Sequence, residues 1–122
     1  MCNFLYSEDH LWFEFDNNTV KFGITDYLKN RTAPIFIDVP DVGEVLNSQD
    51  SNITLESKKI TYKLAVPFCG KIIRRNEELL SNPEFILQQQ EHLNWLCVVE
   101  ICDDEWKSDL MNYDDYEAYI EP

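Results

Sequence analysis

Hydrophobic and polar residues alternate along two neighbouring segments, residues 53–56 and 60–66, which a short polar stretch separates. Alternation with a period of two predicts half-buried β-strands, and two strands this close in sequence predict a β-hairpin. The tip, Ser57-Lys58-Lys59, lacks the Asn-Gly or Asp-Gly pair of the tightest hairpins, so we expect a type I turn or a slightly longer loop. Lys58 and Lys59 should therefore stand in solvent.

The same alternation predicts further strands, and helical spacing predicts a few short helices. Residues 5–24 form a second expected hairpin with a polar turn at 16–18, and single strands are expected over residues 35–40, 44–46, 70–76 and 94–101. Helical segments are expected from Thr25 or Asp26 through about residue 31, over residues 77–82 before Pro83, and over residues 103–113. The pattern is typical of a mainly β protein with short helices, in the α+β class.

A chain of 122 residues has room for one hydrophobic core, so residues 1–122 are expected to form a single domain. Ten Lys and Arg residues against 23 Asp and Glu residues give a formal net charge of −13. Such a charge disfavours binding to nucleic acid or to an anionic membrane, and it predicts neutral or basic protein partners for an acidic surface. The first residues lack the basic start and apolar run that are typical of a signal peptide, and no stretch has the length of an apolar membrane span, so we expect neither. We therefore expect a cytoplasmic monomer, or a mitochondrial matrix protein if a presequence has been removed.

Four cysteines, Cys2, Cys69, Cys97 and Cys102, lie in or beside apolar runs and lack C-x-x-C spacing. This pattern predicts buried, reduced thiols in preference to disulfides or zinc ligands, and we expect no metal site.

Several short motifs, taken in order, resemble the H protein of the glycine cleavage system. The hairpin segment Glu56-Ser57-Lys58-Lys59 is similar to that family's Glu-Ser-x-Lys, and Pro67 and Gly70 follow at the family's spacing. The resemblance extends over most of the chain, through Tyr6-Ser7-Glu8-Asp9-His10-Leu11-Trp12, Gly23-Ile24-Thr25-Asp26-Tyr27 and Val39-Pro40-Asp41-Val42-Gly43.

This resemblance implies a lipoyl-domain-like fold, a barrel-sandwich hybrid of antiparallel sheets with a C-terminal helix. It implies a carrier that shuttles an aminomethyl group on lipoate, joined to Lys59 by an amide bond, and that is a substrate of other enzymes rather than an enzyme itself. Implied partners are a lipoate ligase or lipoyl transferase, glycine decarboxylase, aminomethyltransferase and dihydrolipoyl dehydrogenase. Glu56 precedes Lys59 on the outward face of the same strand, so we expect it to help the modifying enzyme select its lysine.

Other functions stay open at this point. A biotin carrier would place methionine on both sides of the lysine, whereas Lys58 and Ile60 flank Lys59. An independent enzyme would need a nucleophile beside a base, but no such neighbour accompanies His10, which we interpret as a hydrogen-bonded packing residue. A divergent H-like protein that relays lipoate or serves another lipoate-dependent pathway is one alternative, and an unmodified protein-interaction module is another.

Overall fold

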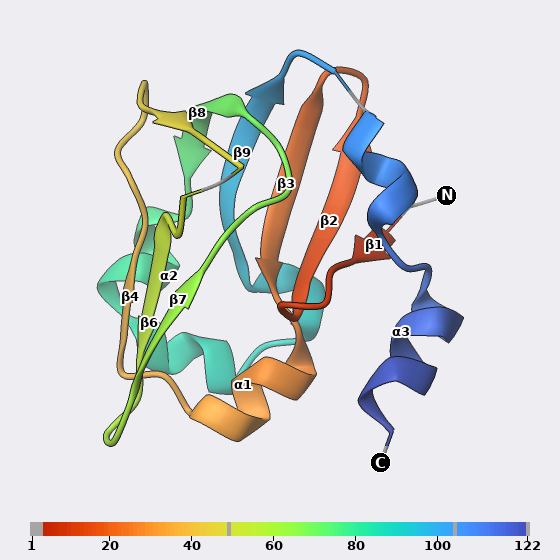
Figure 1. The fold of residues 1–122 in the computed structure, drawn as a ribbon. Helices are drawn as coiled ribbons and strands as arrows, with labels where there is room; N and C mark the ends of the chain where they lie inside the picture. The colour runs from red at the N-terminus through yellow and green to blue at the C-terminus, as the bar shows by residue number, and fades with distance from the viewer. Residues whose placement is uncertain (1–3, 49, 104, 122) are drawn as a thin grey trace.

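The computed structural model describes residues 4–48, 50–103 and 105–121, which form two antiparallel sheets with short helices around them (Figure 1). The large sheet has six strands in the order β1-β2-β3-β9-β8-β5, and the small sheet has three in the order β4-β6-β7. The strands are β1 (Phe4–Tyr6), β2 (Leu11–Asp16), β3 (Thr19–Ile24), β4 (Phe36–Asp38), β5 (Val45–Leu46), β6 (Ile53–Glu56), β7 (Thr61–Leu64), β8 (Gly70–Arg75) and β9 (Trp95–Ile101). The helical segments are α1 (Asp26–Thr32), α2 (Glu77–Ser81), η1 (Pro83–Leu87), η2 (Glu91–Leu93), η3 (Glu105–Asp109) and α3 (Tyr113–Ile120).

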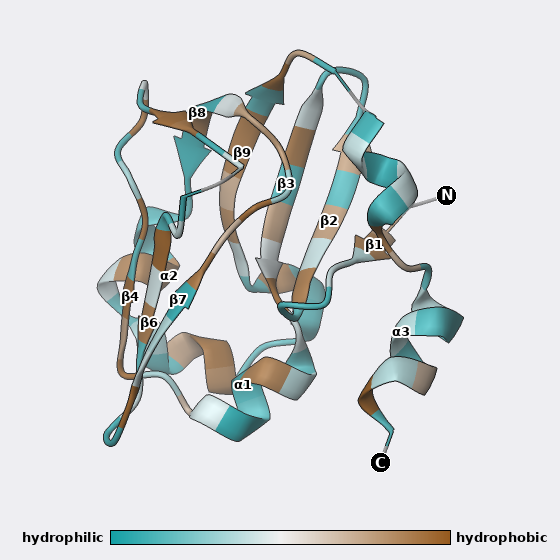
Figure 2. Cartoon of the chain, in the orientation of Figure 1, coloured by the Kyte–Doolittle hydropathy of each residue, from teal (hydrophilic) through white to brown (hydrophobic). Residues whose placement is uncertain are grey.

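The hairpin expected over residues 5–24 is confirmed as β2 and β3, whose register runs from Leu11 opposite Ile24 to Asp16 opposite Thr19. Its first residues do not continue into β2 but form the separate strand β1, which pairs with β2. Asn17 in the turn has a φ of 57°, a left-handed conformation that asparagine tolerates better than most residues. Hydrophobic and polar residues alternate along these strands (Figure 2). The hydrophobic faces of the two sheets therefore turn toward a shared core.

Aromatic side chains fill much of that core. Phe13 lies 5.9 Å from Phe68 between ring centroids, and Phe68 lies 4.8 Å from Trp106. The Trp106 indole N–H donates to the Asp103 carbonyl at 2.9 Å, so its polar atom is paired while its ring is buried. Segments from both ends of the chain thus meet in one cluster.

The expected helix after β3 is also confirmed. The Thr25 side chain accepts a hydrogen bond from the backbone N–H of Leu28, which is a standard N-cap for α1. Leu28 is buried, whereas Tyr27 is only half-buried. At the other end of α1, Ala33 takes the left-handed conformation with a φ of 44°, and its N–H donates to the Lys29 carbonyl.

The helix predicted over residues 103–113 is wrong. A short 3-10 helix, η3, lies there instead, and the α-helix α3 begins at Tyr113. Between them, Met111 exchanges two backbone hydrogen bonds of 2.8 Å with Tyr6 in strand β1. This pairing with β1 interrupts the helix, and Asn112 then caps α3 by accepting from the backbone N–H of Asp115 at 2.8 Å. A tertiary contact overrides the local helical tendency.

The prediction of buried cysteines holds for Cys97 alone among the described residues. Cys97 lies within β9 and is fully buried, whereas Cys69 and Cys102 are exposed. Each of these two lies just outside a strand of the large sheet, Cys69 before β8 and Cys102 after β9. Cys2 lies outside the described residues.

Candidate functional site

The hairpin that carries the two lysines forms as expected from β6 and β7. Its register pairs Ile53 with Leu64 and Glu56 with Thr61. Ile53 and Leu55 are fully buried, so the inward face of β6 anchors the hairpin in the core. Ile60 continues the apolar alternation in the sequence, but it lies beyond the paired strands and is 53% exposed.

Ser57 closes the turn at the tip. Its backbone N–H donates to the Ile60 carbonyl at 2.9 Å, and its hydroxyl oxygen accepts from the Ile60 N–H at 3.2 Å. The Lys59 N–H also points to this hydroxyl oxygen, at 3.4 Å. These bonds define a turn over residues 57–60, slightly longer than a two-residue turn, as the sequence predicts.

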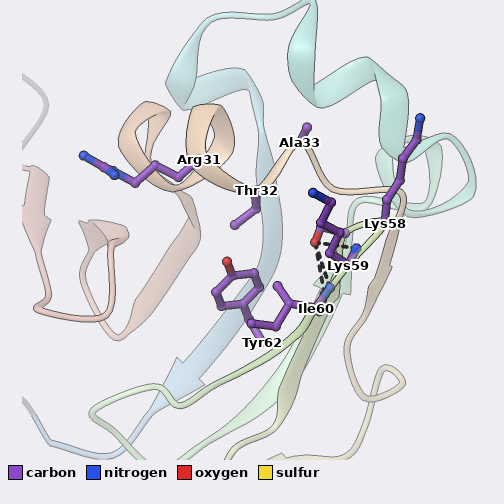
Figure 3. A pocket seen from close by; sticks show the side chains of 8 residues that line it. Arg31, Thr32, Ala33, Lys58, Lys59, Ile60 and Tyr62 are labelled. Atoms are coloured by element: carbon purple, nitrogen blue, oxygen red, sulfur yellow. Dashed lines mark hydrogen bonds between the residues drawn. The ribbon is translucent and has the colours of Figure 1, made fainter.

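Lys58 and Lys59 are both exposed at this tip. Within the described ranges, neither ammonium group has an ion-pair partner. The two side chains leave the turn in different directions (Figure 3). An enzyme that approaches the tip can therefore reach either amine without breaking an ion pair inside the protein.

A groove of about 540 Å³ runs between the hairpin tip and the end of α1. The hairpin contributes Lys59, Ile60 and Tyr62 to its lining, and α1 contributes Arg31 and Thr32 (Figure 3). The Arg31 guanidinium stacks over Tyr27, with 4.2 Å from its central carbon to the ring centroid. Despite the net charge of −13 of the whole chain, the charged residues that line this groove are cations.

Sequence reasoning found the lysines but not the other wall of the groove. Arg31 and Thr32 precede the hairpin by more than twenty residues, and no local pattern links them to it. Only the packing of α1 beside the hairpin brings them together. Glu56 lies where the sequence places it, half-buried at the end of β6.

The two histidines occupy packing positions. His10 Nδ1 lies 2.9 Å from the Tyr116 hydroxyl, which lies 2.8 Å from the Thr25 hydroxyl, and the His10 ring packs 4.6 Å from Tyr27. This confirms His10 as a hydrogen-bonded packing residue. His92 stacks on Phe4, with ring centroids 3.7 Å apart. No group of three or more His, Cys, Asp or Glu side chains in the described part of the chain is arranged to hold a metal ion.

Protonation of His10 should destabilise the protein. Burial lowers the pKa of His10 below its usual 6.5, Asp9 opposes this shift, and Arg31 adds to it. The unfolded chain then binds a proton at a higher pH than the folded chain, so stability falls as the pH drops below about 6.5. The aromatic rings that face His10 belong to Tyr27, Tyr116 and Tyr119. None of these side chains has a carboxylate that could compensate a positive charge on the imidazole.

Urea unfolding at about pH 7, 6 and 5 checks this expectation against His10→Asn. Asparagine tolerates the φ of 70° at this position and does not titrate, while every carboxylate stays in place. The loss of unfolding free energy between pH 7 and pH 5 should be smaller in the variant. Parallel pH profiles would show that His10 does not cause the dependence.

No helix in the described part of the chain is long and apolar enough to cross a membrane. The family model described as glycine cleavage H-protein matches residues 4–122. A glycine cleavage system H protein from Staphylococcus epidermidis is 36% identical over 118 residues, covering 96% of this chain and 94% of that protein. One from Halothermothrix orenii is 32% identical over 120 residues, covering 98% and 94% respectively.

A solved structure adds to the same comparison at the level of the fold. The crystal structure of a glycine cleavage system H protein from Mycobacterium marinum superposes with a TM-score of 0.85 at 23% identity, covering 96% of this chain and 95% of that chain. The likeness confirms the expected barrel-sandwich arrangement of antiparallel sheets. The chain therefore belongs to the glycine cleavage H-protein family, whose members are lipoyl carriers and not enzymes.

Proposed function

We propose that Lys59 carries lipoate in amide linkage and that the chain serves glycine cleavage as its H protein. The observation that carries the proposal is the exposed Lys59 amine, held at the tip of an anchored hairpin beside an open groove. Attachment needs a primary amine that an enzyme can reach, and this amine has no ion pair to break within the described residues. The residues present therefore fit the cofactor.

The chain's contribution is to hold and present the attachment point. Ile53 and Leu55 anchor the hairpin in the core, and Ser57 fixes the turn, so the position of Lys59 is set by rigid structure. Acylation would remove the positive charge of Lys59 and leave Lys58 and Arg31 as the cations beside the groove. When bound, lipoate supplies a disulfide that can accept an aminomethyl group and can be reduced and reoxidised.

The partners follow from this role. A lipoate ligase or lipoyl transferase would modify Lys59, and glycine decarboxylase, aminomethyltransferase and dihydrolipoyl dehydrogenase would use the modified chain. We further infer that residues 1–122 act as one carrier domain, as a monomer in the cytoplasm. Bacterial relatives that match over 94% of their own length support the single carrier domain.

Intact-mass measurement tests the modification. The purified apoprotein would be incubated with lipoate, ATP and a lipoate ligase, and its mass should rise by one lipoyl group. Biotin with a biotin ligase is the matched control, and it should add nothing. A chain that accepts no lipoyl group from either a ligase or a transferase would contradict the proposal.

Glu56 is expected to speed this modification. It ends β6 at the base of the tip, its backbone carbonyl accepts from the Ile35 N–H at 2.7 Å, and its side chain is not part of the buried core. Loss of one charge at the edge of an enzyme contact typically slows association, so Glu56→Gln should be modified on the order of tenfold more slowly. Its thermal stability should stay near that of the wild type.

The control for this prediction is Glu100→Gln, which removes an exposed carboxylate from β9 in the other sheet. Its rate of modification should match the wild type. Equal slowing of both variants would assign the effect to overall charge and would contradict a specific role of Glu56.

A further inference from the structure

Cys69 and Cys102, the exposed cysteines, border one cavity. This hollow of about 430 Å³ also has Lys71 and Glu100 among its lining residues. It lies where β8 begins and β9 ends, at the opposite end of the molecule from the β6–β7 tip (Figure 1). The proposed carrier function uses none of these four side chains.

Extended by one residue beyond the paired strands, the register of β8 and β9 sets Cys69 opposite Cys102. In the pairing of β8 with β9, Lys71 lies opposite Glu100 and Gly70 lies opposite Ile101. The next position of this antiparallel register has Cys69 opposite Cys102. Side chains alternate between the two faces of a strand. Since Gly70 and Ile101 face inward and Lys71 and Glu100 are exposed, the next pair faces outward again. Both cysteines are indeed exposed.

The spacing of opposed residues suits a disulfide. The backbone N–H of Ile101 donates to Asn18, on the β3 side, so Ile101 and Gly70 form a non-hydrogen-bonded pair. Pairs alternate along an antiparallel ladder, so the pairs before and after this one are hydrogen-bonded pairs, whose Cα atoms lie about 5.5 Å apart. Disulfides span Cα separations of roughly 4.4–6.8 Å. The Cys69 thiol donates a weak hydrogen bond to the Ser48 hydroxyl, with 3.9 Å between sulfur and oxygen.

Cys97, which lies within β9, provides the contrast. It is fully buried, and burial raises its thiol pKa to about 12. A thiol must ionise and be reached by the oxidant to react, so Cys97 should stay reduced under conditions that oxidise exposed thiols.

We propose that Cys69 and Cys102 are a modification site, an oxidisable dithiol that forms an intramolecular disulfide. The oxidant is a small-molecule disulfide. One thiolate attacks it, forms a mixed disulfide and releases one small thiol. The second thiolate then attacks the sulfur of the first cysteine in that mixed disulfide, forms the Cys69–Cys102 bond and releases the other small thiol. The two cysteines lose two protons and two electrons, and the oxidant gains them as it becomes two small thiols.

Incubation with oxidised glutathione, followed by alkylation and peptide mapping, tests the proposal. Wild-type protein should yield a peptide that joins Cys69 to Cys102, with Cys97 alkylated only after unfolding. Cys69→Ser and Cys102→Ser cannot close the bond, so each should retain glutathione on its remaining member of the pair. Wild-type protein with glutathione on both cysteines, with only intermolecular disulfides, or with two unreacted thiols would overturn the proposal.

A second measurement needs no variant. The disulfide closes a loop in the unfolded chain, so the Tm of oxidised wild-type protein should exceed that of the reduced protein by several degrees. A lower Tm after oxidation would mean that the register does not extend to these residues, and would also overturn the proposal. Lipoylation should proceed at the same rate in both forms because the tip lies at the other end of the molecule. The outcome is therefore independent of whether Lys59 is the attachment site.

Discussion

Replacing Lys59 with arginine is expected to abolish attachment of lipoate completely, whereas Lys58→Arg should leave it at one lipoyl group per chain. Amide formation needs a primary amine that can lose its proton, and a guanidinium stays protonated and offers no such nucleophile. Both substitutions keep the positive charge at the exposed tip, where neither side chain contributes to the core. The difference between the variants therefore reports the position of the amine.

Intact mass and peptide mapping after incubation with a lipoate ligase provide the measurement. Circular dichroism spectra of both variants should match the wild type, because the turn is closed by Ser57 and not by either lysine side chain. A Lys59→Arg protein that gains the lipoyl mass on Lys58 would show that the enzyme selects the tip without regard to which of the two positions holds the amine.

Gly23→Ala is expected to destabilise the protein strongly, and more than the same substitution at Gly43. A Cβ at Gly23 would meet the Asn94 carbonyl oxygen and would lie 2.8 Å from the Trp12 ring. Both neighbours are buried, and one is backbone, so the strand pairing between β3 and β9 must shift. Overpacking of this kind costs about 3 kcal/mol, a large part of the stability of a small domain.

Gly43→Ala is the matched control for this prediction. Apart from its chain neighbours, no heavy atom of the described residues lies within 4 Å of its added Cβ, but its φ of +95° strains an alanine backbone by about 1–2 kcal/mol. Urea unfolding of the two variants should therefore give a larger loss at Gly23 than at Gly43. Equal losses would mean that backbone conformation, and not the close approach of Asn94 and Trp12, decides the requirement for glycine at position 23.

Local patterns in the sequence are enough to predict most of the strands. The hairpins at 11–24 and 53–64 follow from alternation with a period of two, because each buries one face and is paired with its sequence neighbour. Thr25 predicts the start of α1 for a similar reason, since its side chain caps a helix within three residues. The place of the two lysines at an exposed hairpin tip therefore follows from local sequence alone.

Features that depend on distant contacts do not follow from local sequence. The acidic run before Trp106 favours a helix locally, yet the pairing of Met111 with Tyr6 ends it and moves the α-helix to Tyr113. The groove beside Lys59 needs α1 to lie against the hairpin, and the exposure of Cys69 and Cys102 depends on where two strands end. Neither is encoded in a short window of sequence.

Exchange of labelled carbon dioxide with glycine tests the central claim most directly. Lipoylated wild-type protein would be mixed with glycine decarboxylase, pyridoxal phosphate and glycine, beside Lys59→Arg protein treated in the same way. We expect exchange with the wild type and background exchange with the variant. Absence of exchange, while dihydrolipoyl dehydrogenase still reduces the attached lipoate, would leave a lipoyl carrier of another pathway and contradict the role in glycine cleavage. Failure of both reactions in a chain that accepts no lipoate would instead indicate an unmodified interaction module.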